Sequence, residues 1–143
     1  MSRSDCAAHS LYAWEDAVVA PRDRSLVPFA QLQSLVDHVW TCEGLRWPPR
    51  VRRLPSRAHR TIARATRLAV EAPAALPSWL LLHELAHAMT STAEGENDGH
   101  GPDFVGTYVR LLVRYARLPE ALLVETLADA GITWNRDARP AFA

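Results

Sequence analysis

The chain has 143 residues, enough for one domain that buries a sizeable hydrophobic core. Its 16 basic residues, all of them arginine, are balanced by 16 acidic residues, so the composition excludes the class of strongly basic proteins that bind nucleic acid through net charge. No stretch is apolar enough to span a bilayer, no N-terminal signal peptide is recognisable, and Cys6 and Cys42 lack CxxC spacing. We therefore expect a cytoplasmic protein with two free, buried thiols and no membrane association.

Two helices are expected in an N-terminal region, residues 1–45. Residues 1–10 are polar and are expected to be loose, whereas residues 11–20 can form a helix up to Pro21. Residues 29–40 have apolar side chains at the spacing of an amphipathic helix, and Gly44 ends that helix.

Residues 46–72 form a basic segment with little helical periodicity. Apolar and polar residues alternate in 50–54 and 61–70, which predicts two or three short antiparallel strands. Eight arginines lie here, with no acidic residue between Glu43 and Glu71; these are Arg46, Arg50, Arg52, Arg53, Arg57, Arg60, Arg64 and Arg67.

The arginines allow two interpretations. They can form the solvated outer face of a sheet, which the zero net charge favours, or they can bind phosphates. In the second case we expect weak DNA binding through Arg50, Arg52, Arg53, Arg57 and Arg60. Three tryptophans are candidate base-stacking residues, although each is also a typical core residue: Trp47, Trp79 and Trp134.

Residues 79–90 are predicted to form a buried helix. Pro77 and Ser78 mark its start, and the Ser78 side chain is expected to cap the amides near Leu81. The helix contains the sequence HELAH, in which His83 and His87 lie four residues apart and therefore on one face.

Two imidazoles at this spacing can bind one zinc ion. A catalytic zinc site keeps one position for water and therefore needs a third protein ligand. Glu84, next to the first histidine, is the candidate general base that takes a proton from that water. The sequence thus predicts a metal site whose third ligand comes from elsewhere in the chain.

His100 is the expected third ligand. Residues 91–99 form a polar loop that can return the chain to the first two histidines, and Gly99 and Gly101 flank His100. Pro102 is then well placed at the first turn of a helix through Tyr115, and Pro119 starts a shorter helix that Gly131 ends.

The motif and its flanks resemble the SprT-like (Spartan-type) zinc metallopeptidase domain, whose signature is HExxH followed by HGxxF. The matching residues are HELAH at 83–87 and HGPDF at 100–104, and the resemblance covers about half of the chain, residues 46–117. It is especially close to small actinobacterial metallohydrolases of this group. The resemblance implies that His83, His87 and His100 bind zinc and that Glu84 is the catalytic base.

Other ligand sets remain open or fail. Glu125, on the last predicted helix, is an alternative third ligand of the gluzincin type. The metzincin pattern fails because Thr90 and Ala93 stand where glycine and histidine are required. Glu94 and Glu96 lie in a polar loop and are expected to be solvated.

Several residues are candidates for supporting roles around the metal. Asp103 is expected to orient a ligand histidine or to stabilise its helix N-terminus, and Phe104 to pack the loop. Tyr108 and Tyr115 are candidate oxyanion donors if they face the metal, and His59 is a candidate cleft residue.

We therefore expect a single α+β domain in which a small antiparallel sheet packs against the HExxH helix of a zincin, with residues 78–131 forming the metal-site helices and a closing helix. The expected function is hydrolysis of peptide bonds in a protein or peptide substrate, with one zinc ion per chain. The alternative is a zinc-containing nucleic-acid-binding or regulatory protein without proteolytic activity.

Overall fold

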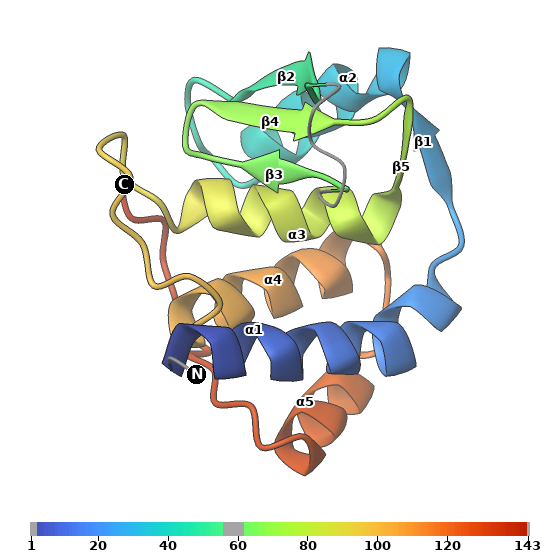
Figure 1. Ribbon diagram of the computed structural model, residues 1–143, viewed down its shortest axis with the longest axis vertical. Coiled ribbons are helices and arrows are strands. Elements are labelled where there is room, and N and C mark those ends of the chain that lie inside the picture. Colours follow the sequence, from blue (N-terminus) through green and yellow to red (C-terminus); the bar gives the residue numbers. More distant parts are fainter. Residues whose placement is uncertain (1–2, 56–61, 143) are drawn as a thin grey trace.

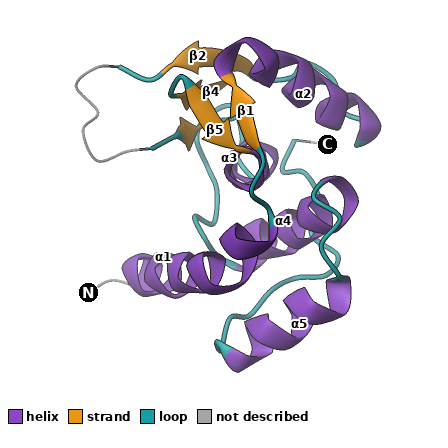
Figure 2. Ribbon diagram, turned by 90° about the vertical axis from the view of Figure 1, so that its right-hand side faces the viewer, coloured by secondary structure: helices purple, strands orange, loops and turns teal. Residues whose placement is uncertain are grey.

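The computed structural model describes residues 3–55 and 62–142. These residues form five α-helices and two small sheets, which confirms the expected mixed α+β class. Helix α3 (Ser78–Met89) runs through the centre, with the strands and α2 (Phe29–Cys42) on one side and α1 (Arg3–Trp14), α4 (Pro102–Tyr115) and α5 (Glu120–Asp129) on the other (Figures 1 and 2). Within the described ranges, no helix has the length and apolar character needed to cross a membrane.

The N-terminal helix is longer than expected. α1 begins at Arg3, so the prediction of a loose stretch is wrong over residues 3–10. After Trp14 the helix widens into a π-helical turn, η1 (Glu15–Val19), and then tightens into a short 3₁₀ turn, η2 (Ala20–Arg22). Because a π turn holds one more residue than an α turn, it changes which side chains face the core. Both Glu15 and Val19 are buried there.

The sheets differ from the expectation in one pairing. The larger sheet has the order β2 (Arg50–Arg53), β4 (Ala69–Ala72), β3 (Arg64–Ala65). β3 and β4 are antiparallel as expected, but β2 pairs with β4 in parallel, so the prediction of an antiparallel sheet is wrong for this pair. β4 takes the central position because its Val70 and Ala72 are fully buried. β3 occupies one side of β4, and β2 pairs along the other.

A second pair of strands escaped prediction. β1 (Leu26–Pro28) and β5 (Ala75–Pro77) form a two-stranded antiparallel ladder. Each strand has only three residues and ends in proline, so neither shows the alternation that identifies a strand from sequence. β5 leads directly into α3, and the pair therefore places the start of that helix.

The helical predictions from α2 onward are confirmed to within about two residues, with one correction at the start of α3. Ser78 does not cap the helix, because Pro77 occupies the N-cap position and Ser78 is the first helical residue. The Ser78 hydroxyl instead donates a hydrogen bond to Asp23 Oδ2 at 2.7 Å. α3 contacts α4 as well as β3, β4 and β5, which is why eight of its twelve residues are buried and the other four are partly buried.

Candidate metal centre

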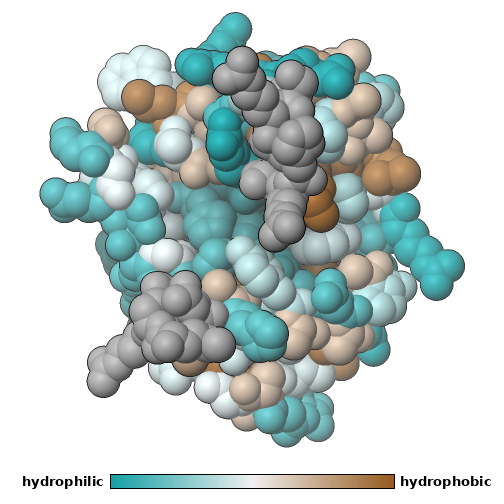
Figure 3. Space-filling model, viewed as in Figure 1, coloured by the Kyte–Doolittle hydropathy of each residue, from teal (hydrophilic) through white to brown (hydrophobic). Residues whose placement is uncertain are grey.

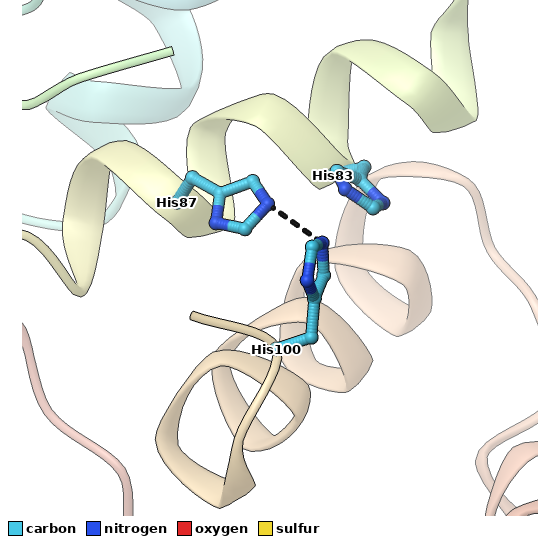
Figure 4. A group of neighbouring side chains, drawn as sticks. All are labelled: His83, His87 and His100. Carbon is cyan, nitrogen blue, oxygen red and sulfur yellow. Dashed lines mark hydrogen bonds between the residues drawn. The ribbon is translucent and has the colours of Figure 1, made fainter. Parts of the chain in front are cut away.

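Three histidines from two separate segments meet beside α3. His83 and His87 project from that helix, and His100 projects toward them from the start of α4 (Figure 4). One ligand nitrogen from each lies within 4.8 Å of the other two. The Nε2 atoms of His87 and His100 are 3.1 Å apart. Two nitrogens bound tetrahedrally to one zinc at about 2.0 to 2.1 Å would lie about 3.3 Å apart, so the arrangement fits a shared zinc ion.

The loop before α4 holds His100 in place through its backbone. Asp98 Oδ2 accepts a hydrogen bond from the amide of Asp103 at 2.8 Å, which satisfies an amide in the first turn of α4. A Cβ atom at Gly101 would lie 2.8 Å from the same Asp98 oxygen and 3.0 Å from the Asp98 carbonyl oxygen, so a larger residue would force Asp98 to shift. Gly99, with φ of 64°, turns the chain on the other side of His100.

Phe104 forms the base of the histidine cluster. It is fully buried, and its ring stacks on the His87 imidazole with centroids 4.2 Å apart. The rings of His83 and His100 lie 5.0 and 5.1 Å from the same phenyl ring. The sequence pattern led us to expect that Phe104 packs the loop, and the structure shows that it packs all three imidazoles as well.

Glu15 is a site residue that the sequence did not reveal. Its side chain is buried, with the residue 2% exposed, and its Oε2 atom lies 2.6 Å from Nδ1 of His83. The Tyr108 hydroxyl donates a second hydrogen bond to the same oxygen, also at 2.6 Å. When the Nδ1–H group of His83 donates its hydrogen bond to this carboxylate, the Nε2 atom of the ring is free to bind a metal. The only sequence signal was a pair of acidic residues, Glu15 and Asp16, in an otherwise apolar helical segment.

Glu84 is buried beside the histidines without a hydrogen-bonding partner. The residue is 4% exposed, and its Oε2 atom has no partner among the described residues. Burial raises the pKa of this carboxyl to about 7; nearby His83 opposes the rise and Glu15 adds to it. A buried acceptor without a donor is costly, so this oxygen is suited to a ligand or water in the cavity.

Two of the three histidines, His87 and His100, are held in their neutral form. Burial, followed by the proximity of His83 and His100, lowers the pKa of His87 to about 2. Burial and the proximity of His83 likewise lower the pKa of His100 to about 4. Neutral imidazole is the form that binds metal ions, so the cluster needs no proton loss from these two rings near neutral pH.

An open cavity of about 590 Å³ lies over Glu84 and two of the histidines. Figure 3 shows the hollow near the centre of the face, with hydrophilic residues at its base. Helices α1 and α3, strand β3 and the loop after α3 contribute its lining: Tyr12, Glu15, Asp16, Ile62, Ala63, Arg64, Ala65, Trp79, Leu80, His83, Glu84, His87, Ser91 and Asn97. β3 is the outer strand of its sheet, so a strand edge borders the candidate metal centre.

Other candidates from the sequence lie away from this centre. Glu125 is exposed on α5 and is not among the residues that converge, and Glu94 and Glu96 are exposed in the loop. Asp103 accepts a hydrogen bond from Asn135 Nδ2 at 2.9 Å and does not orient a histidine. It lies in the first turn of α4, where its charge can stabilise the helix N-terminus, the other role expected for it. The Tyr115 hydroxyl donates its hydrogen bond to Glu43, which lies away from the histidine cluster. Tyr115 is therefore not an oxyanion donor.

The remaining sequence candidates have mixed outcomes. The Tyr108 hydroxyl is engaged by Glu15, so the expected oxyanion role for Tyr108 is not supported. His59 lies outside the described residues. Cys6 and Cys42 are free as expected, but both are exposed, so the prediction of buried thiols is wrong.

The arginines of the basic segment do not form one uniform surface. The buried Arg67 guanidinium donates to the carbonyls of Trp47 and Arg46 and lies over the rings of Trp40 and Phe142. Burial lowers the pKa of Arg67. These contacts give it a structural role within the core.

The other arginines differ in their surroundings. Arg64 makes a two-pronged ion pair with Glu71 at 3.0 and 3.3 Å. Arg50, Arg52 and Arg53 are exposed on β2, whereas Arg57 and Arg60 lie outside the described residues.

The three tryptophans also differ. Trp47 is 77% exposed, with φ of 56°. Trp79 is half-buried in the cavity wall, and Trp134 is half-buried beneath the Arg136 guanidinium. Only Trp47 therefore offers an open ring face among these three.

No protein-family model matches the chain, and neither a curated protein nor a solved structure matches it significantly.

Proposed function

We propose that the protein is a zinc-dependent peptidase of the SprT-like, HExxH type. One observation carries the proposal: three histidines from α3 and the following loop converge within 4.8 Å, while the unpartnered Glu84 carboxyl is buried beside them at the base of an open cavity. A purely structural zinc is usually enclosed by four ligands and is rich in cysteine. Three histidines beside an open cavity instead suit a catalytic ion.

His83, His87 and His100 would hold one zinc ion per chain. When bound there, zinc polarises the carbonyl of the substrate and lowers the pKa of a water molecule. Glu15 holds the His83 ring in the tautomer that leaves Nε2 free, and Phe104 fixes the orientations of all three rings. The chain's own residues therefore preorganise the ligand set.

Glu84 is the general base and acid of the proposed reaction. Its carboxylate accepts a proton from the attacking water as the water oxygen bonds to the carbonyl carbon of the peptide. The carbon–nitrogen bond then breaks, and Glu84 returns the proton to the leaving amine nitrogen. Burial favours both steps, because a carboxyl whose charged form is poorly solvated is a better proton acceptor than an exposed one and still lies beside the leaving amine.

The proposed substrate is an extended peptide. The exposed edge of β3 borders the cavity, and an extended chain can add to such an edge through backbone hydrogen bonds. Trp79, Leu80 and Ile62 provide apolar contacts for side chains of that peptide. Together, the strand edge and the apolar wall favour a protein or peptide over a small polar molecule.

The metal content of purified protein tests the ligand set. Wild type, His100→Ala and Glu125→Ala are purified identically and analysed for zinc. We expect about one zinc per chain in wild type and Glu125→Ala, and little in His100→Ala. Loss of zinc in Glu125→Ala alone would move the third ligand to α5, and a wild type that binds no zinc even when it is supplied would refute the proposal.

Peptide hydrolysis tests the mechanism separately. Zinc-loaded wild type is expected to cleave dye-labelled casein, and Glu84→Gln is expected to keep the zinc but lose the hydrolysis. Full activity in a Glu84→Gln preparation free of wild type would contradict the role of Glu84.

Nucleic-acid binding is a second candidate function, and the exposure of three arginines on β2 favours it. Arg50, Arg52 and Arg53 are exposed on β2 and make no ion pair with any acid in the described part of the chain, and the neighbouring Trp47 ring is open. The test compares DNA retention at several salt concentrations for wild type and the Arg52→Ala, Arg53→Ala double variant. If these arginines contact phosphates, the variant binds less tightly and its affinity depends less on salt. Equal affinity and equal salt dependence would assign β2 to a solvated face.

A further inference from the structure

Tyr12 reaches the candidate metal centre from a part of the chain outside the motif. Its hydroxyl lies 3.5 Å from Nε2 of His100, the same nitrogen that faces Nε2 of His87. Its ring lies roughly parallel to the His83 imidazole, with centroids 6.2 Å apart and an interplanar angle of 22°. The residue is 48% exposed and lines the cavity, so its hydroxyl is accessible to a substrate.

The neighbours of Tyr12 on α1 explain why it points into the cavity. Leu11 and Trp14 are buried, and the Trp14 indole donates a hydrogen bond to Thr126 on α5 at 2.8 Å. Glu15, at the start of the π turn, is held by His83. The burial of Leu11 and Trp14 and the hydrogen bonds of Trp14 and Glu15 fix the rotation of α1 about its own axis. Figure 1 shows α1 alongside α4. Tyr12 is consequently held at the cavity edge by residues that lie in the core.

Metal binding would change the hydrogen-bond acceptor that is available to the Tyr12 hydroxyl. Without a metal, Nε2 of His100 can accept the phenolic hydrogen. With a metal, the lone pair of that nitrogen is used as a ligand and can no longer accept it. The hydroxyl hydrogen of Tyr12 then needs another acceptor. A carbonyl oxygen of a substrate in the cavity would provide one.

We propose that Tyr12 is a catalytic residue that donates a hydrogen bond to the carbonyl oxygen of the scissile peptide as that oxygen gains negative charge. The inference rests on the proposed peptidase function. It assigns to α1 the donor that the sequence led us to seek in Tyr108 or Tyr115, whose hydroxyls are engaged by Glu15 and Glu43. A donor of this kind stabilises the transition state more than the bound substrate.

The test compares Tyr12→Phe with Tyr115→Phe, which removes the same atom from a tyrosine outside the cavity. Both proteins are loaded with Co²⁺, whose visible absorption reports the ligands, and titrated with acetohydroxamate, which presents charged and carbonyl oxygens to the metal. Tyr12→Phe is expected to leave the resting cobalt spectrum unchanged and to weaken acetohydroxamate binding about 10- to 100-fold, the range for a lost hydrogen bond to a charged group. Tyr115→Phe is expected to match wild type in both.

Hydrolysis of dye-labelled casein by the zinc-loaded proteins completes the test. Tyr12→Phe is expected to lower kcat about 100- to 1,000-fold with a much smaller change in KM, as for loss of one oxyanion donor. Acetohydroxamate affinity or kcat within twofold of wild type would overturn the inference, and so would a changed resting cobalt spectrum, which would make Tyr12 a metal ligand. A wild type that binds zinc but cleaves no peptide would instead overturn the proposed function.

Discussion

Replacing Glu15 with glutamine is expected to weaken zinc binding even though Glu15 is not a proposed ligand. The change removes the negative charge that lies 2.6 Å from Nδ1 of His83 while keeping nearly the same shape. The carboxylate accepts two short hydrogen bonds in a buried site, where charge-assisted hydrogen bonds are strong. Without that charge, the His83 imidazole becomes a weaker electron donor, and its tautomer is no longer held.

The expected loss is about 10- to 100-fold in zinc affinity, the range found for partners of metal-binding histidines. A hydrogen bond to a charged group contributes about 1.5 to 3 kcal/mol, which corresponds to the same range in a dissociation constant. The assay is competition for zinc with a chromophoric chelator at fixed pH, with circular dichroism to confirm that the variant is folded.

Two further variants sharpen the comparison. Tyr108→Phe keeps the Glu15 carboxylate and removes only one of its donors, so it should weaken zinc binding less than Glu15→Gln. Glu43→Gln alters another buried carboxylate, which pairs with Arg110 and Arg114 away from the histidines, and should leave zinc affinity unchanged. A folded Glu15→Gln protein with zinc affinity within twofold of wild type would refute the role of Glu15.

Three further predictions concern stability and the loop. In metal-free protein the pKa of Glu84 rises from 4.5 to about 7, so the stability it contributes is present below pH 4.5 and is lost as the pH rises through 7. Urea unfolding should therefore show Glu84→Gln more stable than wild type by about 3 kcal/mol at pH 8, and the same difference at pH 5 would contradict this. Gly101→Ala should lower zinc affinity in the chelator assay, because the added methyl group collides with Asp98; unchanged affinity would show that the loop adapts. Arg67→Ala should lower the free energy of unfolding by about 2 to 4 kcal/mol, because it loses contacts in the core. Arg52→Ala should change the free energy of unfolding by less than about 0.5 kcal/mol. Equal effects of the two variants in thermal unfolding would refute this distinction.

Sequence periodicity was most informative where the contacts are local. The spacing of His83 and His87 places them on one face of a helix whatever that helix packs against. Apolar periodicity likewise predicted α2, α3 and α4 closely, because residues three and four apart share a face. The glycines around His100 indicated a tight return of the chain, and the loop does bring His100 to the other two histidines.

Strand pairing and burial of charge were not predictable in this way. Alternation located β2, β3 and the start of β4 but not the parallel pairing of β2 with β4, since the choice of partner depends on which strand is best buried at the centre of the sheet. The sequence predicted that the arginines of the basic segment share one surface. In the structure Arg67 lies in the core and Arg64 is paired with Glu71. These outcomes depend on neighbours that are distant in sequence.

The sequence by itself identified the three histidines as candidate metal ligands and Glu84 as the candidate general base. It could do so because a metal site requires particular residue types, two of them here at helical spacing. Only the tertiary structure placed Tyr12 and Glu15 beside them. Glu15 meets His83 across 68 positions of sequence, and a π turn sets the direction of its side chain. Packing of α1 against the rest of the core decides that direction, because no local pattern encodes how one helix rotates against another.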